Sequence, residues 1–253
     1  MALWSAYTEP TQHNLLELLG ATQAKTKLSY ILGTGSIEDC LKEVNIAYEA
    51  GIRCLKVKIG KDSREEDKLI AEIHQAFPEI SIYVDANQCL AYPEDMGRLE
   101  RLAQVGVLYC EEALLTHQIE KRRSLKAFSP LPIIGDDSCF TAADFERELA
   151  FRTIDIVNIK TARTGFSHSK RIYHQALENK IGIMVGSQAS SLIGCIHALS
   201  FALCPHIQHE TEGSFYLKTY KDFTDIKIES GYVFRDEIKR ASEEARQAIL
   251  TRL

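Results

Sequence analysis

The chain repeats one short pattern at a nearly constant interval. Eight apolar runs rich in β-branched residues begin at residues 27, 54, 81, 107, 131, 154, 181 and 205, so successive starts lie 23 to 27 residues apart. The stretches between the runs have helical periodicity; in residues 36–51, Ser36 is a suitable N-cap and Gly51 a suitable C-terminal residue. Strands that alternate with helices in this way indicate parallel strands joined by crossover helices.

Eight such units in 253 residues favour a (β/α)8-type, TIM-like barrel in the α/β class. The alternative is an open doubly wound sheet, which usually carries a glycine-rich phosphate loop after its first strand. Residues 33–40, GTGSIEDC, hold only G-x-G without the third glycine. We therefore predict the barrel.

The composition excludes several classes of protein. The net charge is −5, and the basic run Lys121-Arg122-Arg123 is short enough to be read as a solvated helix face, so we expect no nucleic-acid binding. No segment approaches about 20 consecutive apolar residues, so we expect no membrane span. The seven cysteines are scattered without a C-x-x-C pair, which is typical of reduced thiols in a cytoplasmic protein.

Polar side chains follow the predicted strands at the ends where barrel enzymes carry their catalytic groups. A single charge at a strand end usually marks only where the chain meets solvent. Barrel geometry, however, directs all these ends into one shared mouth. The candidates are Lys56, Lys58, Asp85, Asn87, Glu111, Glu112, Asp136, Asp137, Lys160, Ser187, Gln188, Glu210 and Glu212.

Three of these carboxylates have the spacing of a metal site. Asp85, Glu111 and Asp136 lie 26 and 25 residues apart, one structural unit each, which places them on adjacent strands. Anions that converge in one cleft repel each other unless a cation joins them. Oxygen ligands favour a hard divalent ion, Mg2+ being the usual choice. In the alternative, each carboxylate pairs with a neighbouring lysine.

The lysines have the placement of acid–base groups. Lys56 and Lys58 share one face of a strand, toward the barrel interior or mouth, while Val57 and Ile59 face the helices. Two adjacent ammonium groups and partial burial each lower a lysine pKa, which would make a general base. Lys160 ends strand six, across the barrel from strand two, so a bound substrate would have a lysine on each side.

Seven ordered motifs resemble those of the enolase superfamily, and most closely its muconate lactonizing subgroup. They are KVKIG, VDAN, CEEALL, IIGDDS, IVNIK, TG and GSQASSLIG, between about residues 25 and 235. The resemblance implies a divalent metal, Mg2+ or alternatively Mn2+, that holds a small carboxylate substrate while a lysine removes the α-proton to give an enediolate. The outcomes in this subgroup are racemisation or epimerisation, cycloisomerisation, and dehydration as in o-succinylbenzoate synthases.

The resemblance also implies roles for individual residues. Lys58 matches the base on one face and Lys56 its electrostatic neighbour, a candidate contact for the substrate carboxylate. Lys160 matches the lysine of the opposite face. The matching metal ligands are Asp85, Glu111 and Asp136, and Asn87 matches the asparagine that supports them.

The chain departs from the family pattern in several places. Ala113 replaces a proline, and Asp136-Asp137-Ser138 stands where the family has Asp-Glu-Ser. Residues 1–25 resemble the segment that joins a capping domain to the barrel, so we expect a barrel at 26–234 without most of that cap. Residues 235–253 are predicted to form an amphipathic helix. An uncovered mouth favours a homo-oligomer that covers it.

The end of strand eight bears on substrate choice. Glu210-x-Glu212 resembles the paired carboxylates with which dipeptide epimerases hold an ammonium group, and Glu210 with Gly213 resembles cycloisomerases; a solvated acidic loop is the third interpretation. We favour an epimerase or an o-succinylbenzoate synthase-like activity. Two alternatives stay open: a barrel that has lost catalysis and serves as a binding or scaffold protein, and a Schiff-base aldolase with Lys160 as nucleophile.

Overall fold

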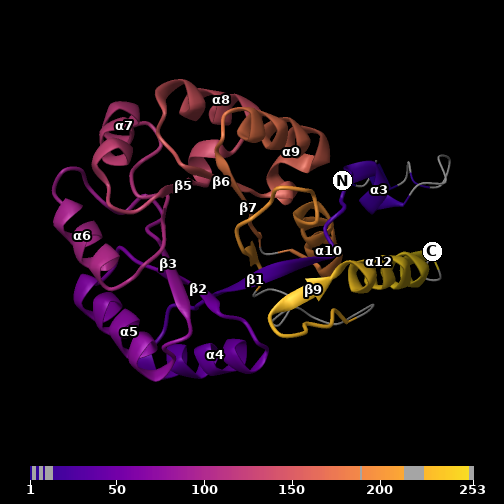
Figure 1. Cartoon of the computed structure of the whole chain (residues 1–253), viewed down its shortest axis with the longest axis horizontal. Helices are drawn as coiled ribbons and strands as arrows, with labels where there is room; N and C mark the ends of the chain where they lie inside the picture. Colours follow the sequence, from indigo (N-terminus) through magenta and orange to yellow (C-terminus); the bar gives the residue numbers. More distant parts are fainter. Residues whose placement is uncertain (2–3, 6–7, 9–13, 189, 214–224, 251–253) are drawn as a thin grey trace.

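The structure is a computed structural model that describes residues 1, 4–5, 8, 14–188, 190–213 and 225–250. Within these residues, eight parallel strands form a nearly closed barrel in the order β7-β6-β5-β4-β3-β2-β1-β8, with the helices outside the ring (Figure 1). The barrel strands are β1 (Lys25–Ile31), β2 (Cys54–Lys58), β3 (Ser81–Asp85), β4 (Cys110–Glu111), β5 (Ile133–Gly135), β6 (Ile156–Ile159), β7 (Gly182–Val185) and β8 (Thr211–Glu212).

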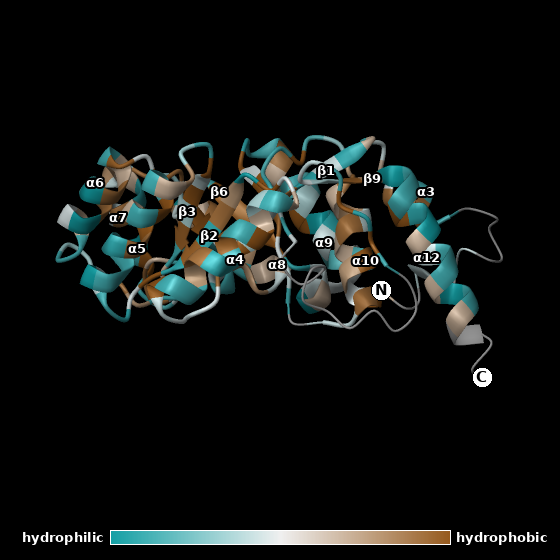
Figure 2. Cartoon of the chain, turned by 90° about the horizontal axis from the view of Figure 1, so that it is seen from below, coloured by the Kyte–Doolittle hydropathy of each residue, from teal (hydrophilic) through white to brown (hydrophobic). Residues whose placement is uncertain are grey.

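Helices follow the strands as the sequence predicts. They are α3 (Leu15–Leu19), α4 (Ile37–Glu49), α5 (Ser63–Ala76), α6 (Met96–Gln104), α7 (Ile119–Phe128), α8 (Ala142–Phe151), α9 (Thr161–Glu178), α10 (Leu192–Ala202) and α12 (Arg235–Leu250), with a 3-10 turn η1 at Asp137–Cys139. A ninth strand, β9 (Tyr232–Phe234), pairs antiparallel with β1. Helices α3 and α12 lie together on one side of the barrel in both views (Figures 1 and 2).

The predicted (β/α)8 barrel is confirmed, and so are the details of the first helix. Ser36 caps α4 by accepting a hydrogen bond from the backbone N–H of Asp39. Gly51 follows with φ +81°, and a Cβ there would collide with the backbone of Ser230. Only glycine is compatible with both constraints, so this turn is determined by its residue type.

Two local predictions are wrong. The last strand begins at Thr211 rather than near residue 205. Pro205 has no N–H to donate to a strand ladder, and its carbonyl accepts from the Tyr173 hydroxyl over 2.7 Å. Arg122 is 3% exposed and bonded to buried carboxylates, so it does not lie on a solvated face of α7. Parts of the predicted segments fall outside the described residues: 2–3, 6–7 and 9–13 in the connecting segment, and 251–253 in the final helix.

The barrel interior is apolar near the N-terminal ends of the strands. A buried cluster there joins strands β2, β3, β5, β6 and β7 and consists of Cys54, Tyr83, Ile134, Ile156 and Met184. We call this cluster the floor. A larger apolar layer lies between strands and helices, where the hydropathy colouring shows brown strands inside and teal outer helix faces (Figure 2). No helix in the described parts of the chain has the length and apolar character needed to cross a membrane.

Ring closure depends on the first and last strands. β1 pairs with β8 through Leu28 with Thr211 and Ser29 with Glu212. Among the described residues, no backbone ladder joins β7 to β8. The seam between these two strands is thus held by side chains and by the contact of β8 with β1.

Candidate active site

Lys56 lies at the centre of a buried charge cluster in the barrel mouth. Its Nζ is 3.0 Å from Asp85 Oδ2, 2.7 Å from Glu111 Oε1 and 2.6 Å from Glu212 Oε1. The four side chains are at most 3% exposed. Strand register explains the gathering: Lys58, Asp85 and Glu111 lie side by side on β2, β3 and β4, and Lys56 precedes Lys58 by two residues on the same face.

Lys58 lies at the solvent edge of this cluster. Its side chain is 39% exposed, and its Nζ is 3.3 Å from Asp85 Oδ2 and 2.5 Å from Asn87 Oδ1. Asn87 adopts the left-handed backbone conformation, φ 42°, and its N–H donates to Asp85 Oδ1 over 3.0 Å. Asn87 therefore orients both a carboxylate and the lysine that meets solvent.

Lys160 enters the mouth from β6, opposite β2. Its Nζ is 2.6 Å from Asp136 Oδ2, and the side chain is 8% exposed. Arg163, in the first turn of α9, reaches Asp136 Oδ1 over 2.9 Å and Asp137 over 3.0 Å. Asp136 is thus held between two cations from the following unit of the barrel.

Sequence reasoning missed two polar members of the mouth. Asn158 Nδ2 donates to Glu111 Oε1 over 3.1 Å and to Glu212 Oε1 over 3.4 Å, so it connects β6 with β4 and β8. The strand alternation that pairs Lys56 with Lys58 also puts Asn158 on the face of Lys160, and this signal would have found it. Arg163 lies on a helix, where strand alternation does not apply.

The remaining candidates lie around the cluster. Glu212 Oε2 accepts from the Ser187 N–H over 2.7 Å. Asp137 accepts from Gln88 Nε2 over 3.1 Å, and the side-chain oxygen of Gln188, with its amide suitably oriented, faces Arg163. Glu112 points away from the interior, between β4, β5 and the helices.

The fold also separates Glu210 from the charge cluster. Its Oε1 is 2.8 Å from Lys27 Nζ, and it precedes the pair Leu28–Thr211, toward the N-terminal end of β8. Glu212 bonds Lys56 instead. The two glutamates therefore do not form one paired carboxylate site.

The pKa shifts differ from the sequence prediction. Burial by itself would lower the pKa of Lys56, but Glu111, Glu212 and Asp85 outweigh it and raise that pKa well above its ordinary value. The pKa of Lys160 is also raised, because Glu212 and Asp136 outweigh its burial. The prediction of a lowered lysine pKa is wrong for Lys56, since it neglected the surrounding carboxylates.

The pKa values of Glu212 and Glu111 are shifted in opposite directions. Burial would raise the pKa of Glu212, but Lys56 and Lys160 lower it to about 2. Burial raises the pKa of Glu111 well above its ordinary value, and the nearby acids Asp85, Glu212 and Asp136 add to that effect against the single favourable charge of Lys56. Glu111 is thus the carboxylate of the cluster that most lacks positive charge.

The donor set can be tested against a divalent cation. Asp85, Glu111 and Asp136 supply hard oxygen ligands from three adjacent strands, and Glu111 Oε2 is buried without a hydrogen-bond partner among the described residues. In the described part of the chain, however, no three His, Cys, Asp or Glu side chains are arranged around a common point. The ammonium groups of Lys56 and Lys160 hold the carboxylates instead, as in the ion-pair alternative. The residues fit the ion in type and strand position, and metal ligation stays a prediction.

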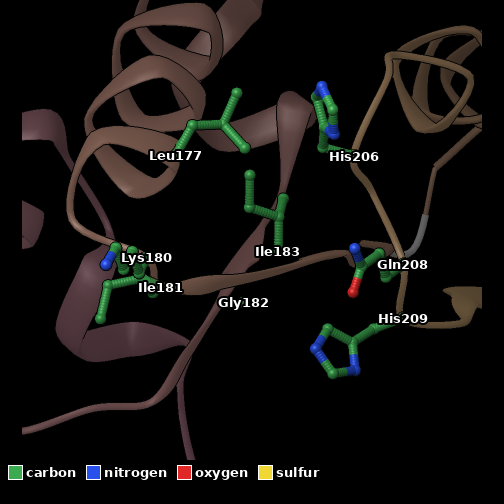
Figure 3. A pocket seen from close by; sticks show the side chains of 8 residues that line it. All are labelled: Leu177, Lys180, Ile181, Gly182, Ile183, His206, Gln208 and His209. Atoms are coloured by element: carbon green, nitrogen blue, oxygen red, sulfur yellow. The ribbon is translucent and has the colours of Figure 1, made fainter.

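A cavity of about 250 Å³ lies elsewhere, at the N-terminal ends of the strands. Its lining comes from the end of α9, the start of β7 and the loop before β8, with His206, Gln208 and His209 on one side and Lys180 and Gly182 on the other (Figure 3). None of the mouth residues contributes to it. The charge cluster, rather than this cavity, is therefore the candidate active site.

The chain resembles known enzymes over most of its length. The chain is 27% identical over 188 residues to L-Ala-D/L-Glu epimerase of Thermotoga maritima, a match that covers 74% of this chain and 54% of that protein. It is 24% identical over 236 residues to o-succinylbenzoate synthase of Bacillus subtilis, with 92% and 63% covered. The chain thus spans little more than half of the epimerase and under two thirds of the synthase.

Its fold is that of a known group of barrels. The crystal structure of muconate lactonizing enzyme from Mucobacterium Smegmatis superposes with a TM-score of 0.86 at 28% identity, covering 93% of this chain and 68% of that one. The family model described as Enolase C-terminal domain-like matches residues 39–239, which include the strand ends from Lys56 to Glu212. This chain belongs to the enolase C-terminal domain-like family.

Proposed function

We propose that this barrel catalyses divalent-metal-dependent removal of the proton α to a substrate carboxylate, through an enediolate. The observation that carries the proposal is the placement of Lys58 at the end of β2 and of Lys160 directly after β6, on opposite sides of one mouth that also holds Asp85, Glu111 and Asp136. A base on one face of the substrate and an acid or stabilising cation on the other is what this arrangement offers to such a reaction.

Positive charge is the main requirement of such a reaction. The α-proton of a carboxylate is very weakly acidic, so its removal needs cations where negative charge develops. The residues that would hold the metal are Asp85, Glu111 and Asp136; the bound ion would supply Lewis-acid charge stabilisation. Lys56 supplies a fixed charge of this chain, held by three carboxylates.

The two outer lysines have different environments. Lys58 is partly exposed and contacts Asn87, so it is the lysine best placed to meet a substrate α-proton. Lys160 is buried against Asp136 with a raised pKa, which favours its ammonium form as proton donor or as a stabilising charge. These assignments make Lys58 the base and Lys160 the group that faces it.

The placement of the two strand-eight glutamates favours one substrate class. A dipeptide epimerase-like reaction needs carboxylates free to hold a substrate ammonium group, but Glu212 is bonded to Lys56 and Glu210 to Lys27. A dehydration like that of o-succinylbenzoate synthase needs no such site. We therefore favour loss of water from a β-hydroxy carboxylate, in which the α-proton passes to Lys58 and the C–O bond breaks as the hydroxyl takes a proton from the Lys160 ammonium and leaves as water.

The test is exchange of the substrate α-proton with solvent deuterium, followed by NMR over a panel of β-hydroxy acids, dipeptides and N-acyl amino acids. We expect exchange with Mg2+, its loss on chelation, and a fall of roughly a hundredfold to ten-thousandfold in Lys58→Ala. Lys27→Ala, which removes an ammonium at the other end of the barrel, is the matched control and should keep the rate.

Each alternative gives a different result. Exchange that persists in excess EDTA would contradict metal dependence. Borohydride trapping of an adduct on Lys160 would favour the Schiff-base aldolase instead. Metal binding without exchange of any acid in the panel would favour a barrel that binds without turnover.

A further inference from the structure

Glu112 follows Glu111 directly but points the opposite way. It adopts the left-handed backbone conformation, φ 41°, which is uncommon outside glycine and asparagine. Glu111 faces the barrel interior and Glu112 points outward, where it is 0% exposed. None of the steps proposed above uses the Glu112 carboxylate.

The Glu112 carboxylate binds the end of the neighbouring strand. Its Oε2 accepts from the Asp136 N–H over 2.7 Å, from the Ser138 N–H over 2.9 Å and from Ser138 Oγ over 2.9 Å. These bonds hold the backbone on both sides of Asp137, immediately after β5. The orientation of the Asp136 side chain toward the mouth therefore depends on an anchor outside the barrel.

The backbone of Glu112 makes a second connection to β5 and one to the segment that follows β3. Its N–H donates to the Ile134 carbonyl over 2.9 Å, and its carbonyl accepts from the Gln88 N–H over 2.6 Å. One residue thus connects the ends of β3, β4 and β5, the three strands that carry the acidic side chains Asp85, Glu111 and Asp136.

Arg122 holds this anchor in place. Its Nη1 is 2.5 Å from Glu112 Oε1 and 2.9 Å from the Leu114 carbonyl, and its Nε is 3.1 Å from Glu148 Oε2. Glu148, from α8, is 0% exposed and also accepts from Thr153 Oγ1. A chain of buried charges therefore runs from α8 through α7 to the end of β5.

Stability alone accounts poorly for such a network. Buried ion pairs often contribute no more to stability than apolar side chains of equal volume, and Arg122 Nη2 has no partner among the described residues. We propose that Glu112, fixed by Arg122, is a positioning residue that sets Asp136 relative to Asp85 and Glu111 for cation binding. This inference rests on the proposed function.

The test uses Glu112 variants of the whole chain with two readouts, Mn2+ affinity by calorimetry and amide hydrogen exchange of residues 134–140. Glu112→Ala removes the anchor. It should weaken Mn2+ binding by roughly tenfold to a hundredfold and speed exchange at Asp136 and Ser138. Glu112→Gln keeps an acceptor oxygen of the same reach and should restore both readouts to within about threefold.

Two further variants keep the test decisive. If Glu112→Ala does not fold, Glu112→Asp keeps the charge opposite Arg122 but withdraws the oxygens from both amides, and it should show the same losses. Arg98→Met is the matched control, because it breaks a comparable ion pair with Glu66, 2.7 Å apart, between α5 and α6. It should lower thermal stability without changing either readout.

The outcomes separate the two proposals. Wild-type Mn2+ affinity and amide protection in both Glu112→Ala and Glu112→Asp would overturn the positioning role. If the wild-type chain binds no Mn2+, the metal step of the proposed function fails. Amide exchange then decides the positioning role alone: faster exchange in the Glu112 variants supports it and unchanged exchange overturns it.

Discussion

The mouth and the floor of this barrel are built from the same strands but hold different chemistry. Along β2, Cys54 belongs to the apolar floor and Lys56 to the charge cluster, two residues apart on one face. Along β6, Ile156 and Asn158 repeat the change. The floor buries apolar area, which stabilises the fold, whereas the mouth buries charge, which costs free energy unless every charge is paired.

Both β2 and β6 therefore contribute to the stability of the fold through their floor residues and to the candidate site through their mouth residues. The floor needs only apolar side chains of suitable volume, so it tolerates exchange among them. The mouth needs particular ionisable groups at particular heights. Changes at the two ends should therefore fail in different ways, and the following predictions test that separation.

The largest expected effect comes from the centre of the mouth. Lys56→Met leaves Asp85, Glu111 and Glu212 buried without their shared ammonium, and we expect unfolding free energy to fall by about 3–5 kcal/mol in urea titrations. Lys42→Met, which removes an exposed ion pair with Glu38, should leave it close to the wild-type value. Equal stability of the two variants would mean that the mouth charges are not coupled.

A cavity in the floor should cost stability without altering the chemistry. Met184 is 0% exposed, so Met184→Ala should lower unfolding free energy by about 2–5 kcal/mol. Deuterium exchange per folded molecule should stay close to wild type, because Met184 pairs with Asn158 in the sheet but contributes no polar group to the charge cluster. Met96→Ala, at the half-buried start of α6, is the control. A large loss of exchange rate in folded Met184→Ala would break the distinction between the two ends.

His209, near the N-terminal ends of the strands, should make the stability of the fold depend on pH in a defined direction. Burial lowers the pKa of His209 below 6.5, against a smaller raising effect of Glu210. The unfolded chain then binds the proton more readily, so His209 contributes stability above pH 6.5 that is lost as pH falls toward the folded pKa. His209→Gln should lower the dependence of melting temperature on pH in that window; an unchanged slope would contradict this origin.

The smallest effect is expected for the ion pair beside the floor. Lys27 is 43% exposed in its pair with Glu210, so Lys27→Met should change unfolding free energy by at most about 1 kcal/mol. Double-mutant cycles with Glu210→Gln measure the coupling directly. A coupling as large as that at Lys56 would show that both ends depend on buried charge.

The sequence predicted the barrel because its evidence is local. Each strand and helix has its own periodicity, and the constant spacing requires no knowledge of distant contacts. The gathering of Lys56, Asp85 and Glu111 followed from this spacing and from strand alternation, and the structure places all three together. Their catalytic and metal-binding roles stay predictions.

The errors concern effects that depend on residues far apart in the chain. The raised pKa of Lys56 depends on Glu212, 156 residues away, and no local pattern gives that distance. Arg122 was assigned to solvent as one of three consecutive basic residues, but its buried partner Glu148 comes from the next helix. Burial of a charge is decided by such partners rather than by its neighbours in sequence.

The pairing of β1 with β8 also has a consequence for the time course of folding. Strands β2 to β7 each pair with the strand before them, so they can add in the order of synthesis. β8 must instead meet β1, where Thr26 and Thr211 bond across 185 residues. Closing so long a loop is slow. Glu212 reaches Lys56 only at that step, so the last strand to dock both closes the ring and completes the charge pairing of the mouth.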